Sequence, residues 1–136
     1  MTKDDYVYSY KSLKELINNT RGGEPKLTGN TTARFLDDGR LAIRLYWTDI
    51  IIIDSNDQYE LRTNGHTENT TLSRLNGFSP ARVVKRQGEF FLLKDYSAEN
   101  HKKKNLIPFF DGIKVDRYGD IIPQAPDNNI TVTVNA

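Results

Sequence analysis

The sequence predicts an α+β domain, mainly an antiparallel β-meander with an N-terminal helix and one short helix packed on the sheet. Apolar residues recur at helical spacing near the N-terminus, and a period of two replaces that spacing after Asn30. Short Asp–Gly and Gln–Gly pairs separate the alternating runs, as turns do. At 136 residues the chain has the length of one domain.

The first predicted element is an amphipathic helix from about Ser9 to Thr20, because its apolar residues recur three or four positions apart. Gly22–Gly23 ends this pattern. We assign residues 1–24 to the helical unit and residues 25–123 to the β-rich domain. Residues 124–136 form a tail that starts as a linker and ends in an alternating stretch, either an added strand or a frayed end.

Several strands follow the helix. Asp38–Gly39 predicts a tight hairpin, because such turns need the positive φ that glycine adopts without strain. Ile50–Ile53 predicts a central strand covered on both faces. Trp47 continues the apolar face of the preceding strand, so we expect it to anchor the core. The alternative is that Tyr46 and Trp47 form a stacking wall for a base. Further downstream, Gln87–Gly88 predicts another hairpin.

The composition excludes several kinds of site. Without cysteine there is no disulfide, no thiol catalysis and no cysteine-ligated metal. His66 and His101 lie in different predicted loops, and no metal-binding histidine motif is present, so we expect no metal and no cofactor. Nucleophile-elbow, P-loop and dinucleotide motifs are also missing, which argues against an enzyme. The sequence shows no signal peptide and no apolar run of membrane-spanning length, which favours a cytosolic location.

The stretch from Thr63 to Phe78 is dense in small polar residues, and helix capping explains much of this density. We expect a short helix near residues 70–77, with Asn69 or Thr70 as its N-cap. Asn76–Gly77 would end it, because both residues tolerate the left-handed conformation found there.

The same stretch also fits an anion site. The start of a helix presents free amide N–H groups and a partial positive charge, and Arg74 lies one turn later. Phosphate or carboxylate would suit such a corner, and a basic loop would steer it there. The candidate ligand-binding residues are Thr67, Thr70, Thr71, Arg74, Asn76, Lys102, Lys103 and Lys104.

The distribution of charge is compatible with a phosphate-bearing ligand. The net charge is only +1, but the segment from Arg62 to Lys104 holds nine basic residues against four acidic ones. Basic residues around Lys85 are interleaved with Phe90 and Phe91, which is a cue for nucleic-acid binding. Paired phenylalanines within a hairpin are also typical of a core. The basic residues are equally consistent with solvated faces of strands.

One part of the chain, roughly Asn30 to Val115, resembles a small domain family of unknown function that is widespread in bacteriophage and plasmid genomes. Two positions depart from that pattern: Leu72 stands where the family usually has lysine, and His66 where a large aromatic residue is common. The missing lysine weakens the anion site. The segment "FFDGIKV" also resembles the closing segment of that family. The matching positions are Asn30, Thr31, Arg44, Leu45, Thr48, Thr67, Thr70, Thr71, Arg74, Leu75 and Asn76.

The resemblance implies a phage origin. We therefore expect a phage-encoded, non-enzymatic binding protein in the host cytosol, with nucleic acid or a nucleotide as its ligand. The alternative is a protein-binding accessory factor, such as a host-takeover or counter-defence inhibitor, which would use an exposed strand edge or an apolar patch. A small hydrolase is the third hypothesis.

Overall fold

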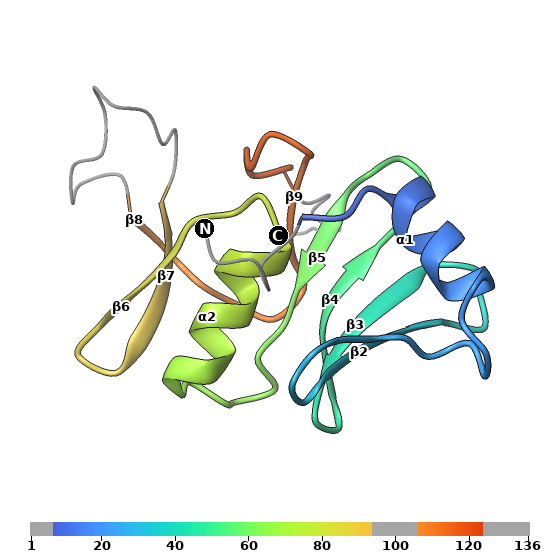
Figure 1. The fold of residues 1–136 in the computed structure, drawn as a ribbon. Coiled ribbons are helices and arrows are strands. Elements are labelled where there is room, and N and C mark those ends of the chain that lie inside the picture. The colour runs from blue at the N-terminus through green and yellow to red at the C-terminus, as the bar shows by residue number, and fades with distance from the viewer. Residues whose placement is uncertain (1–6, 94–105, 124–136) are drawn as a thin grey trace.

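The computed structural model describes residues 7–93 and 106–123, which form two antiparallel sheets and two helices (Figure 1). This confirms the predicted α+β class. No helix in these two ranges is long and apolar enough to cross a membrane. The elements are α1 (Tyr10–Asn18), β1 (Lys26–Thr28), β2 (Thr31–Phe35), β3 (Leu41–Leu45), β4 (Thr48–Ile53), β5 (Tyr59–Leu61), α2 (Asn69–Phe78), β6 (Val83–Arg86), β7 (Glu89–Leu93), β8 (Leu106–Pro108) and β9 (Ile113–Val115).

The chain leaves the larger sheet once and returns to it. The larger sheet has the order β1-β2-β3-β4-β5-β9, and the smaller one the order β6-β7-β8. After β5 the chain forms α2 and the smaller sheet, and β9 then pairs antiparallel with β5. In Figure 1, α2 lies between the two sheets and β9 runs beside β5. The strands therefore do not form one continuous meander.

The N-terminal helix forms as predicted. Ser9 and Ser12 make a capping box, in which each side chain accepts from the backbone N–H of the other. Leu13 and Ile17 lie one turn apart and are buried in the main core. The helical unit thus shares its core with the β-rich part of the chain.

The hydrophobic core packs on one face of the larger sheet, and β4 is a central strand of that sheet. All four isoleucines from Ile50 to Ile53 are at most 6% exposed. The pairing with β3 contains an irregularity: Ile43 lies opposite Ile51, but Arg44 lies opposite Asp49. Ile50 is the extra residue of a β-bulge, and both it and Ile51 join the core.

The second helix is longer than the sequence predicted, and both of its caps differ. It begins at Asn69 with Glu68 as the N-cap, so neither Asn69 nor Thr70 has that role. At the other end the helix continues through Gly77 to Phe78, because Gly77 and Phe78 are buried in packing against neighbouring elements. Ser79 follows in extended conformation, and its hydroxyl donates to the carbonyl of Leu75.

Contacts between residues far apart in the sequence hold β9 and the turn after it against the segments that follow β5 and α2. The Asp111 carboxylate, just before β9, accepts from the backbone N–H groups of Thr63 (2.8 Å) and Asn64 (2.9 Å), just after β5. The turn that follows β9 lies against the loop after α2: a Cβ at Gly119 would stand 2.5 Å from the carbonyl oxygen of Pro80. Only glycine fits this approach.

This approach yields a prediction with a matched control. Gly119 and Gly39 both have φ +90°, but a Cβ at Gly39 meets nothing within 4 Å. Substituting alanine at either position adds left-handed strain of about 1–2 kcal/mol, and only Gly119→Ala adds the clash. In urea unfolding, Gly119→Ala should therefore lose clearly more free energy of unfolding than Gly39→Ala. Equal losses would show that the two loops do not meet.

Candidate functional site

The structure brings together only part of the predicted anion site. Thr70 and Thr71 lie in the first turn of α2 and line a common hollow. Thr70 is exposed, whereas Thr71 is 2% exposed and its hydroxyl lies 3.5 Å from the Glu68 carboxylate. Thr67 lines a different hollow, beside the end of the smaller sheet. Lys102, Lys103 and Lys104 lie outside the described residues.

Arg74 does not line this hollow at the helix start. Its Nε donates to the hydroxyl of Thr31 over 2.9 Å, and its Nη2 lies close to Gly29. Thr31 is fully buried at the beginning of β2. The guanidinium therefore joins α2 to the turn between β1 and β2.

Asn76 has a structural role as well. Its side-chain amide donates to the carbonyl of Val83 over 2.8 Å, and its oxygen accepts from the N–H of Val83 over 2.7 Å. The side chain thus pairs with β6 as a neighbouring strand would. Because these contacts use both polar atoms, the amide is not presented to a ligand.

The hollow beside Thr70 and Thr71 lies between the β3–β4 hairpin and the start of α2, and we call it the hairpin pocket. Its volume is about 320 Å³. The sheet contributes mostly apolar side chains, and the helix start contributes polar ones. It is lined by Leu45, Tyr46, Trp47, Thr48, Ile50, Thr63, His66, Glu68, Thr70 and Thr71.

The charge at the mouth of the hairpin pocket is the opposite of what an anion needs. Glu68 and His66 are its only ionisable lining groups apart from the Tyr46 hydroxyl, and the Glu68 carboxylate lies 3.7 Å from His66 Nδ1. A carboxylate at a helix N-terminus is favoured by the helix dipole. It also repels phosphate. The Glu68 side chain is therefore suited to accepting hydrogen bonds from a ligand, and it opposes the binding of a phosphate.

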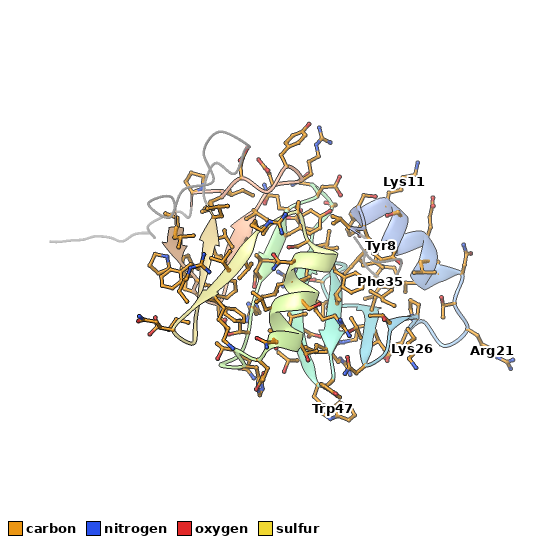
Figure 2. All side chains as sticks on the ribbon, turned by 60° about the vertical axis from the view of Figure 1, so that its left-hand side comes forward. Tyr8, Lys11, Arg21, Lys26, Phe35 and Trp47 are labelled. Atoms are coloured by element: carbon orange, nitrogen blue, oxygen red, sulfur yellow. The ribbon has the colours of Figure 1, made fainter. Side chains whose placement is uncertain are left out.

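Trp47 is not the core anchor that the sequence predicted. It is 88% exposed, at the tip of the β3–β4 hairpin, and Tyr46 beside it is 64% exposed. Figure 2 shows Trp47 extending beyond the ribbon at this tip. The apolar alternation of β3 ends at Leu45, because the next two residues form the turn.

Tyr46 occupies a strained position in this turn. Its φ is +54°, a conformation that glycine or asparagine usually adopts and a bulky side chain rarely does. The strain is fixed by a backbone hydrogen bond from Tyr46 N–H to the carbonyl of Asn30. Strained residues of this kind cluster at functional sites. Two exposed aromatic rings at a strained turn thus mark the hairpin tip as a candidate contact surface.

The face of the larger sheet opposite the core is rich in arginine, and we call it the outer face. Strand register places Arg34 beside Ala42, Arg44 beside Asp49, and Glu60 beside Ile52 and Lys114. The buried core side chains of both helices pack on the other face. The cationic side chains of the outer face are Lys26, Arg34, Arg40, Arg44, Arg62 and Lys114.

Each of the two strand carboxylates on the outer face is shared by two arginines. Asp49 pairs with Arg34 at 2.7 Å and with Arg44 at 3.6 Å. Glu60 pairs with Arg62 and, at 3.6 Å, with Arg40. The bulge at Ile50 brings Asp49 to this face, opposite Arg44. The Asp49 group therefore retains an excess of one positive charge. The Glu60 group does not, because Arg40 also pairs with Asp38 at 2.8 Å.

Trp47 contributes to both the hairpin pocket and the outer face. Besides the hairpin pocket, it lines a groove of about 220 Å³ with Asp49, Ile52 and Arg62, residues of the outer face. Sequence reasoning missed this arrangement, because the basic residues come from five strands or their ends. The available signal was the alternation of β2 and β3, in which Arg34 and Arg44 each stand between two apolar residues.

The comparisons with known proteins identify the lineage of the chain. The sequence model described as Kyanoviridae Gp96 protein, a phage protein family, matches residues 9–133. The chain belongs to this family. No curated protein and no solved structure matches it.

Membership in the Kyanoviridae Gp96 family confirms the phage origin that the sequence resemblance implied. The match extends from just before α1 to residue 133, beyond the segment from Asn30 to Val115 that carried the resemblance. It therefore spans both sheets and both helices. The hairpin pocket and the outer face both lie within the family's extent.

The contacts of Asn76 predict a large loss of stability on truncation. Asn76→Ala leaves the N–H and C=O of Val83, a residue that is 2% exposed, without their partners. We expect the free energy of unfolding to fall by about 2–3 kcal/mol in urea titrations. Asn69→Ala, on the exposed first turn of the same helix, should change it by less than about 0.5 kcal/mol. An Asn76→Ala protein of undiminished stability would contradict the structural role.

The strain at Tyr46 predicts a gain of stability on substitution. Tyr46→Asn keeps the turn and relieves the left-handed strain, so the free energy of unfolding should rise by about 1 kcal/mol. Trp47→Asn, in the same turn but without a positive φ, is the control and should give no gain. If Tyr46→Asn destabilises the protein instead, the tyrosine ring supports the hairpin by packing.

Proposed function

We propose that this protein is a non-enzymatic binding protein that acts in the cytosol of the phage host and binds single-stranded nucleic acid through its outer face. The observation that carries the proposal is the surplus of cations on that face. Four guanidinium groups meet three carboxylates there, those of Asp38, Asp49 and Glu60, and Lys26 and Lys114 add two further charges.

The geometry of the cations supports contact with phosphates. Arg34 and Arg44 are about one quarter exposed, so they are held against the sheet with part of each side chain open to solvent. Guanidinium groups bind phosphate through two parallel hydrogen bonds, and a side chain that is already ordered loses less entropy on binding. Asp49 therefore holds both arginines in place and neutralises only one of their two charges.

The exposed aromatic residues support a single-stranded ligand. Proteins that bind single strands combine a basic surface with aromatic side chains on which unpaired bases stack. Trp47 and Tyr46 lie at one end of the outer face and have the exposure that such stacking requires. In a duplex the bases are already stacked on each other, so these rings would find no partner.

The second candidate is a protein-binding accessory factor, such as an inhibitor of a host function. The observation that favours it is the same pair of exposed aromatic residues, because tyrosine and tryptophan are enriched at the centre of protein interfaces. Such an interface would bury the hairpin tip and would not need the charge of the outer face. The dependence of binding on salt separates the two functions.

A binding titration tests the proposal. Trp47 is the only tryptophan, so its fluorescence reports on the hairpin tip alone. Oligothymidylate should quench it. If the three surplus charges each meet a phosphate, the logarithm of the association constant should fall with the logarithm of salt concentration with a slope of about −2.

Matched variants localise the binding. The double variant Lys26→Gln and Lys114→Gln should reduce the steepness of the slope by about 1 to 2. The control is Lys11→Gln with Lys14→Gln, which removes the same charge from α1, and it should leave the slope unchanged. Equal effects of the two double variants would contradict binding at the outer face. A partner bound with almost no dependence on salt would favour the protein-binding function.

A further inference from the structure

The hairpin pocket and the groove on the outer face meet at the hairpin tip, where Trp47 and Thr48 line both cavities. A strand whose phosphates lie on the outer face therefore reaches the pocket across this tip. The step that follows rests on the proposed function.

The size and walls of the pocket suit one flat, partly apolar group. About 320 Å³ is at the small end of the range of ligand sites, which is roughly 300–1,000 Å³. Leu45 and Ile50 form apolar walls, and Tyr46 and Trp47 contribute aromatic rings. A single nucleobase presents such a flat surface, whereas a phosphate has no affinity for these walls.

The polar groups of the pocket select among the bases. Glu68 carries a carboxylate with two acceptor oxygens, and its side chain is 66% exposed and so free to turn toward a ligand. Two adjacent N–H donors on one edge of a base meet both oxygens at once. Guanine has such an edge, formed by its N1–H and its N2 amino group. Adenine and cytosine place an acceptor beside their amino group, and thymine and uracil place carbonyls on both sides of a single N–H.

From this geometry we infer that the hairpin pocket takes one guanine base of the bound strand, stacked against the Trp47 ring and read by the Glu68 carboxylate. His66 next to Glu68 and the Thr70 hydroxyl complete the polar rim. The strain at Tyr46 agrees with this function, because the turn keeps an aromatic residue where asparagine would be more stable. The site thus supplies base preference, and the outer face supplies affinity.

The test compares oligothymidylates of equal length that differ in one central base. A single guanine should strengthen binding, measured by Trp47 fluorescence, by about tenfold over adenine, cytosine or thymine at that position. The slope with salt should be the same for all four, because the phosphates are unchanged. Equal affinity for all four bases, with the salt slope intact, would overturn the guanine inference and leave the proposed function standing. Failure of every oligonucleotide to bind would overturn both.

Two variants assign the preference to the carboxylate. Glu68→Gln replaces one acceptor by a donor and should abolish the guanine preference without changing the salt slope. Glu68→Asp keeps the charge at the start of α2, which protects folding, but withdraws the carboxylate by one methylene and should lose most of the preference. Glu15→Gln, exposed on α1, is the control and should keep it. Retention of the preference in both Glu68 variants would overturn the role of this residue.

Discussion

The bulge in β4 is the constraint on which both faces of the larger sheet depend. Without the extra residue, Arg44 would lie opposite Ile50, and Asp49 would be aligned with Leu45 on the core side. The bulge instead turns both Ile50 and Ile51 into the core and places Asp49 opposite Arg44. A change of register by one residue reverses the side of every following side chain. The one extra residue therefore allows neighbouring isoleucines to fill the core while Asp49 forms ion pairs on the outer face.

The sequence predicted those features that depend on neighbouring residues. Asp38–Gly39 and Gln87–Gly88 do join strands, and Leu13 and Ile17 share the buried face of α1. These features follow from glycine conformation and helical periodicity, which a short window reveals. Trp47 was placed wrongly because its turn contains neither glycine nor asparagine, so the apolar alternation appeared to continue through it.

Two of the candidate-site residues have structural partners that lie on other elements of the fold. Arg74 meets Thr31, 43 residues earlier, and the Asn76 amide meets the backbone of Val83. Both side chains look available in the sequence because their partners are set by the packing of α2 against both sheets. The outer face was invisible for the same reason: its cations become neighbours only when the strand order is known. Composition revealed a basic middle segment, but not which surface it would charge.

The two proposed regions need opposite electrostatics, and the fold places both of them next to one aromatic residue, Trp47. A surface that binds phosphates needs surplus cations, whereas a pocket that reads the donors of a base needs an acceptor. If Glu68 lay among the arginines of the outer face, ion pairing would occupy its oxygens. Trp47 lines both the cavity that holds Glu68 and the groove that holds Arg62. Under the proposed function, the exposed position of this ring, unfavourable for a core residue, is therefore the one at which a single strand would use both surfaces together.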